Sequence, residues 1–175
     1  YGNDPKAISL VMLGGAQAYR GFPDQAATFV DKAVSHAHVL DFPFVTAWVH
    51  WMATWVFRDI GDVEQTEKHA TAQLKIALEK NFSPMKQGAS IILGWVQYRH
   101  NSPNSLQKIE RGFQQLLDLG PVPFWELKYI IDYIDALERE NETEKAIETL
   151  DKCMQEFPRD VVNLSYFSIP IRNNA

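Results

Sequence analysis

The chain has 175 residues, 46% of them hydrophobic, which is the size of one domain with enough apolar side chains for a core. The formal net charge is −5 and charges of both signs are interspersed, so nothing resembles a basic footprint for nucleic acid or for a membrane surface. No run of about twenty apolar residues predicts a membrane span. Cys153 is the only cysteine, which excludes an internal disulfide and favours a reducing, cytoplasmic location.

Residues typical of helix ends recur along the chain at two sets of positions. Gly21, Gly61, Asn101 and Asn141 are spaced forty residues apart, and a second series lies roughly midway between them: Pro43, Pro84, Pro123 and Pro158. Glycine and asparagine end helices, whereas proline suits the first helical turn. The spacing therefore predicts helix, turn, helix, turn, four times over, and no alternation long enough for a sheet. The predicted helical hairpins span residues 6–40, 44–80, 84–119 and 123–157.

The first hairpin is expected to pair a helix over Lys6–Arg20 with a helix over Asp24–Leu40. The first of these helices has an apolar side formed by Ile8, Met12, Ala16 and Tyr19. Asp24, directly after Pro23, is a plausible N-cap for the second helix. That helix carries small apolar residues along one face: Ala26, Val30, Ala33 and Ala37.

The second hairpin is expected to pair Phe44–Ile60 with Val63–Lys80. Its first helix carries Trp48, Trp51 and Trp55 at spacings of three and four, so the indoles share one helix face. Asp62 and Gln65, three residues apart, resemble a capping box.

In the third hairpin Ser83 is expected to cap a helix whose first residue is Pro84, and the turn lies at Asn101–Asn104. The fourth hairpin follows Pro123. Residues 159–175 have no clear helical period and are expected to form an irregular or extended tail.

The hairpins resemble tetratricopeptide repeats. In that pattern a small residue opens the second helix, with further apolar or small residues four and seven positions later and a proline after the helix, as at Ala146, Leu150, Cys153 and Pro158. The second hairpin departs from it, and the forty-residue period exceeds the usual thirty-four. The resemblance implies an all-α fold in which residues 1–158 form a right-handed superhelical array of about four antiparallel helical hairpins.

A narrower resemblance covers nearly the whole chain. The segments YGNDP, GFPDQA, FPF, ILGW and IERGFQQL are similar to the C-terminal repeat arrays of bacterial STAND-class signalling ATPases, which are often linked to adenylate/guanylate cyclase or transcription-regulator domains. In that family the array is a non-catalytic sensor or scaffold. The chain begins without methionine, which is typical of a fragment, and the resemblance places any catalytic domain upstream.

No enzyme site assembles from the sequence. It contains no G-x-x-x-x-G-K-[ST] loop for nucleotides and no H-E-x-x-H pair for zinc among its five histidines. Cys153 has no adjacent histidine and occupies a position where the repeat favours a small buried residue. We therefore expect no catalytic residue, no metal site and no cofactor in this chain.

The resemblance to peptide-binding repeat arrays also yields a candidate groove. There the first helix of each hairpin lines the concave face, and residues six, ten and thirteen positions before each turn point into it. With the residues that fringe these columns, the predicted partner-binding residues are Trp48, Trp51, Trp55, Arg58, Ile91, Trp95, Tyr98, Arg99, Lys128, Ile131 and Asp135. Tryptophan and arginine are enriched at binding hot spots. The alternative is that the indoles are core residues, as large aromatic side chains usually are.

The expected function is a protein–protein interaction or scaffold module, which binds a peptide, a partner protein or its own upstream domains in the concave groove. A small-molecule inducer sensor that uses the same aromatic groove is the alternative. Because the ends of a repeat array expose apolar surface when they lack polar caps, a homodimer through those ends is a further expectation.

Overall fold

The structure, a computed structural model, describes residues 4–119 and 127–156, and these residues form eight α-helices and no strand. The all-α prediction is therefore confirmed for the described part of the chain. The predicted start of the fourth hairpin at Pro123, the proline at 158 and the tail over 159–175 lie outside the described residues. The helices are α1 (Pro5–Tyr19), α2 (Pro23–Leu40), α3 (Pro43–Asp59), α4 (Val63–Lys80), α5 (Ser83–Arg99), α6 (Ser105–Leu117), α7 (Leu127–Arg139) and α8 (Thr143–Glu156).

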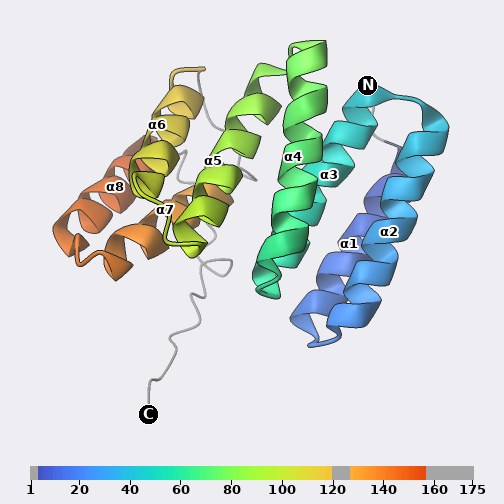
Figure 1. Ribbon diagram of the computed structural model, residues 1–175, viewed down its shortest axis with the longest axis horizontal. Helices are drawn as coiled ribbons and strands as arrows, with labels where there is room; N and C mark the ends of the chain where they lie inside the picture. The colour runs from blue at the N-terminus through green and yellow to red at the C-terminus, as the bar shows by residue number, and fades with distance from the viewer. Residues whose placement is uncertain (1–3, 120–126, 157–175) are drawn as a thin grey trace.

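Consecutive helices pack in pairs: α1 with α2, α3 with α4, α5 with α6, and α7 with α8. The pairs follow one another across the molecule, from the blue pair α1–α2 to the orange pair α7–α8 (Figure 1). The first helix of each pair also contacts the first helix of the next, so α1 touches α3, α3 touches α5, and α5 touches α7. The side on which these four helices meet is called the first-helix side below.

The forty-residue spacing has a backbone cause. Gly21 and Gly61 have φ angles of 81° and 80°, and Asn101 and Asn141 have φ angles of 53° and 61°. All four residues therefore follow a first helix in a left-handed conformation, which glycine adopts freely and asparagine tolerates. This conformation reverses the chain into the second helix of each pair.

Two predicted N-caps are wrong. The carbonyl group that accepts the first helical hydrogen bond belongs to Phe22 in α2 (from the Ala26 N–H, 3.0 Å) and to Phe82 in α5 (from the Lys86 N–H, 2.9 Å). Asp24 and Ser83 therefore lie inside the first turn, because each helix begins one residue earlier than predicted. By contrast, Asp62 does cap α4, since its carboxylate accepts a hydrogen bond of 3.0 Å from the Gln65 backbone.

The buried side of α1 is also not its most apolar side. Ala7, Val11 and Gly14 are buried, whereas Met12 and Tyr19 are 54% and 74% exposed. Gly14 lies against α2, where an added Cβ would stand 3.1 Å from the Val30 side chain and 3.2 Å from a backbone oxygen. Close packing of small residues thus decides which face of α1 meets α2. On α2 the predicted face of Ala26, Val30, Ala33 and Ala37 is fully buried.

The core consists of two clusters that meet at α3. One joins α1, α2 and α3, and the other runs from Trp51 and Trp55 through α5 and α6 to α7 and α8. Trp48 and Met52 pack against both clusters. The tryptophan helix is therefore the structural centre of the described chain. No helix in this described part combines the length and apolarity required to cross a membrane.

Candidate functional site

The tryptophans of α3 lie on the first-helix side but are largely covered. Trp51, Trp55 and Trp95 are only 6%, 8% and 7% exposed, and Trp48 is half-buried. The rings of Trp51 and Trp55 pack edge to face with their centroids 4.5 Å apart. Burial of this degree is typical of core aromatic residues rather than of an open groove.

The cover over Trp51 is supplied by α7, a helix of the fourth pair. The indole Nε1–H of Trp51 donates a hydrogen bond to the hydroxyl group of Tyr129, and Tyr129 is itself buried. The tyrosine reaches α3 by passing directly over Gly88 of α5. A Cβ at position 88 would lie 2.2 Å from the tyrosine oxygen, so no residue with a side chain fits there without a shift of Tyr129.

A second set of contacts joins α1, α3 and α7 beside this pair. Arg58 of α3 forms an ion pair with Asp132 of α7, and both side chains are less than a tenth exposed. Lys128 of α7 places its amino group 2.7 Å from Asp59 of α3 and over the ring of Trp55, 5.1 Å from its centroid. The hydroxyl of Tyr19, from α1, donates to Asp59 at 2.9 Å. We call this set the inter-hairpin cluster: Tyr19, Trp55, Arg58, Asp59, Lys128 and Asp132.

The charges in the inter-hairpin cluster balance one another in a partly dry environment. Burial by itself would raise the pKa of Asp59, but Arg58 and Lys128 outweigh burial and hold this pKa below its usual value. Burial and the Asp59 carboxylate raise the pKa of Tyr19 to about 12. Burial also raises the pKa of Asp132 to about 6, against the attraction of Arg58, so its carboxylate is still charged at neutral pH. Two cations therefore face two carboxylates, with one tyrosine hydroxyl at the solvent edge.

The remaining predicted site residues make a contact within α5, join α5 to α7, or stand apart. Arg99 lies over the Trp95 ring at 5.7 Å, and the Tyr98 hydroxyl donates to the backbone carbonyl of Ala136 at 3.3 Å. Asp135 forms an ion pair with Arg139 on the surface of α7, and this pair does not connect Asp135 to the other predicted groove residues. Two aliphatic residues complete the set, with Ile91 fully buried and Ile131 half-buried.

Sequence reasoning missed Tyr129, Asp132 and Asp59, although they make the central contacts. None of them falls in the three groove columns, because those columns were transferred from arrays in which hairpins contact only their neighbours. One signal was present in the sequence. Asp132 interrupts the apolar run Ile130-Ile131-Asp132-Tyr133-Ile134, and a charge in such a run requires a buried partner.

A buried histidine pair lies elsewhere on the tryptophan helix. The Nδ1 atoms of His50 in α3 and His69 in α4 are 2.9 Å apart, so one ring donates and the other accepts. Burial, followed by its histidine neighbours, lowers the pKa of His50 to about 3, and burial followed by Lys68 lowers that of His69 to about 4. Both rings are therefore neutral at physiological pH. Among the described residues no group of three potential ligands could hold a metal ion.

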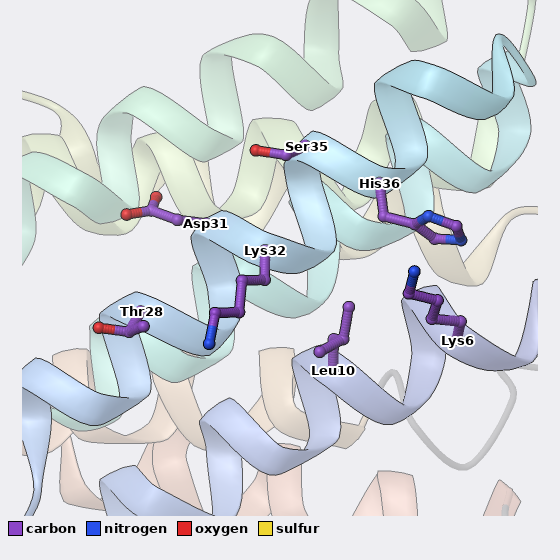
Figure 2. Close-up of a pocket in the computed structure, with 7 residues that line it drawn as sticks. All are labelled: Lys6, Leu10, Thr28, Asp31, Lys32, Ser35 and His36. Carbon is purple, nitrogen blue, oxygen red and sulfur yellow. The ribbon is translucent and has the colours of Figure 1, made fainter.

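Two shallow cavities lie away from the tryptophans. The larger, of about 520 Å³, is an open groove in which Lys6 and Leu10 of α1 face Thr28, Lys32 and His36 of α2 (Figure 2). The smaller, of about 270 Å³, lies between α5 and α6 and is lined by polar residues such as Gln97, Lys108 and Arg111. His36 is already bonded to Asp4, the N-cap of α1, at 3.0 Å. Neither cavity offers an enclosed apolar site of the kind that binds small molecules.

No family, curated protein or solved structure matches the chain.

Proposed function

We propose that the chain is a non-catalytic protein–protein interaction module, a right-handed tetratricopeptide-like array that binds a protein or peptide on its concave, first-helix side. The observation that carries the proposal is the inter-hairpin cluster, in which aromatic and charged side chains from three helix pairs converge. Tyr19 is 74% exposed there, beside Lys128 and Asp59, whose side chains are about a quarter exposed. Aromatic and charged groups at one partly dry place are typical of binding hot spots.

The wider role of the module follows from the sequence resemblance. We propose that it is the sensor or scaffold part of a larger bacterial signalling protein, with a STAND-class ATPase or cyclase domain elsewhere in that protein. In such a protein the natural partner is either another protein or one of its own domains. A small-molecule inducer is less well supported, because neither of the two cavities described above touches a tryptophan.

A peptide-display experiment tests the proposal. Peptides enriched on the immobilised chain from a random displayed library would be labelled, and their affinities measured by fluorescence anisotropy for the unmodified chain, for Tyr19→Ala and for Lys32→Ala. Tyr19→Ala is expected to weaken binding at least about tenfold, the loss typical of a hot-spot residue. Lys32→Ala is the matched control, since Lys32 is an exposed residue of α2 outside the cluster.

The outcomes separate the alternatives. Equal affinity for all three proteins would place the binding surface elsewhere, and failure to enrich any peptide would argue against an interaction module. Quenching of tryptophan fluorescence by a panel of metabolites, without any peptide binding, would favour the small-molecule sensor instead.

A further inference from the structure

The contacts of α7 reach beyond its neighbours. In a simple repeat array each repeat touches only the adjacent ones. Here α7 bonds to α3, two pairs back, through side chains separated by 69, 74 and 78 residues in sequence. The amino group of Lys128 also lies 3.4 Å from the hydroxyl of Tyr19 on α1, 109 residues away. The first-helix side of the earlier pairs thus carries a helix, and that helix belongs to the same chain.

Three side chains of α7 make these bonds, and each meets a chemically matched group. The carboxylate of Asp132 pairs with the guanidinium of Arg58, a planar fork suited to carboxylates. Trp51 can only donate a hydrogen bond, and the Tyr129 hydroxyl accepts it. Lys128 pairs with Asp59. Asp132 lies four positions after Lys128 and three after Tyr129, so it is on the same side of the helix as both. The three residues form the sequence pattern Lys-Tyr-x-x-Asp.

The bonds that join α7 to α3 are mainly polar, whereas its attachment to its own neighbours is mainly apolar, with one hydrogen bond from Tyr98 to the backbone of Ala136. Its contacts with α3 and α1 are hydrogen bonds, ion pairs and the position of Lys128 over Trp55. Its packing within the fourth pair and against α5 and α6 buries Ile130, Ala136 and Leu137. The polar bonds to α3 can be replaced by equivalent bonds from another helix, because Trp51, Arg58 and Asp59 stay in place on α3.

We infer that Trp51, Arg58 and Asp59, together with Tyr19, form a receptor for an amphipathic helix with the pattern Lys-Tyr-x-x-Asp, and that α7 is the chain's built-in occupant. The inference rests on the proposed function and specifies the class of partner: a helix that lays one face into a groove. Gly88 is part of the receptor, because its missing side chain leaves the space through which the tyrosine reaches Trp51.

The built-in occupant would restrain binding. A competitor in the same chain acts at an effective concentration of about the millimolar range. An external helix therefore gains access only when it binds more tightly or when the bonds of α7 are weakened. The contact between α7 and α3 is thus an autoinhibitory one, which a partner helix relieves by replacing it.

The test uses the full chain and a labelled peptide with the sequence of α7, LKYIIDYIDALER, residues 127–139. Two variants of the full chain weaken the contact between α7 and α3: the double variant Lys128→Ala/Asp132→Ala and the isosteric Asp132→Asn. Circular dichroism shows whether each variant folds, and Asp132→Asn is used if the double variant does not. Fluorescence anisotropy is expected to show the peptide binding to the folded variant at least about tenfold more tightly than to the unmodified chain. Adding Arg58→Ala to that variant should abolish the gain, and so should the substitution Asp132→Asn in the peptide.

A folded variant that binds the peptide no better than the unmodified chain would overturn the inference, as would a gain that survives Arg58→Ala. The proposed function is judged separately by the displayed-peptide experiment. If displayed peptides bind at Tyr19 but the α7 peptide does not, the module stands and the helical partner class is wrong. If neither binds, both proposals fail.

Discussion

The amino group of Lys128 lies 2.7 Å from a carboxylate oxygen of Asp59, although 69 residues separate them in sequence. This ion pair joins the first helix of the fourth pair to the first helix of the second. The same amino group lies over the ring of Trp55, so Lys128 of α7 contacts both an acidic and an aromatic side chain of the tryptophan helix. A series of helix pairs joined by such a contact should unfold as one unit rather than pair by pair.

The Lys128–Asp59 pair should contribute measurably to stability. Lys128→Ala is expected to lower the free energy of unfolding by about 1 kcal/mol. A partly buried ion pair contributes more to stability than an exposed one, and the substitution also removes the contact of the lysine with the Trp55 ring. Urea unfolding measures the change, and Lys32→Ala, whose amino group lies 5.4 Å from the Phe29 ring, is the matched control. In a double-mutant cycle with Asp59→Ala, a coupling energy near zero would contradict the prediction.

Trp51 should behave as a core residue. Trp51→Ala is expected to cost about 3–5 kcal/mol, the range for large-to-small aromatic substitutions in cores, and in addition leaves Tyr129 without its indole donor. Thermal or urea unfolding followed by circular dichroism gives the value. The comparison is Tyr19→Ala, an exposed aromatic residue, for which a change within about 1 kcal/mol is expected. A Trp51→Ala variant as stable as Tyr19→Ala would show that the indole is not packed as described.

Two glycines in first helices should respond in opposite ways to alanine. Gly88→Ala is expected to destabilise the protein by about 1–3 kcal/mol, because its Cβ would overlap the Tyr129 hydroxyl at 2.2 Å. Gly15→Ala, whose Cβ would meet only the Val56 side chain at an ordinary 3.9 Å, is expected to stabilise α1 by about 0.5–1 kcal/mol.

The cause of the Gly88 effect can be isolated by making the same substitution in a Tyr129→Ala background. The overlap is then absent, so Gly88→Ala should cost nothing further and can gain the usual helical preference for alanine. A penalty of the same size in both backgrounds would show that Tyr129 is not the obstacle.

The His50–His69 pair should make the protein sensitive to acid. The pKa values of these rings in the folded protein, about 3 and about 4, lie below the ordinary 6.5. Below about pH 6.5 the unfolded chain binds protons that the folded chain cannot, so stability is lost as the pH falls toward 4. By this linkage each ring costs about 2 kcal/mol at pH 5. His69→Gln should therefore lose less stability between pH 7.5 and pH 5 than the unmodified chain.

Asp132 acts in the opposite direction and needs its own control. Its pKa is raised to about 6 in the folded protein, so between pH 6 and 4 the folded state binds a proton before the unfolded state does, which adds stability. The histidine comparison should therefore be repeated in an Asp132→Asn background, with urea unfolding at each pH. Equal pH slopes for the two histidine forms in that background would contradict a buried neutral pair.

The order of helices and turns could be predicted from the sequence because its causes are local. Glycine or asparagine at 21, 61, 101 and 141 adopts positive φ with little strain, and this property is independent of the rest of the chain. The exact helix starts were less predictable, since Asp24 and Ser83 are good capping residues that lie inside the helix, Asp24 as the second residue of α2 and Ser83 as the first residue of α5. The choice depends on which carbonyl accepts the first hydrogen bond, and Phe22 and Phe82 supply it here.

The sequence by itself thus determined the all-α class, the order of the helices and the location of the tryptophan helix as the first helix of the second pair. Only the tertiary structure decided what covers that helix. The approach of α7 to α3 depends on contacts between residues far apart in sequence, such as Tyr129, which passes over Gly88 to reach Trp51, and the forty-residue period does not specify these contacts. The same approach places Asp132 beside Arg58 and Lys128 beside Asp59, so tryptophans with the spacing of a groove are buried beneath a helix of the same chain.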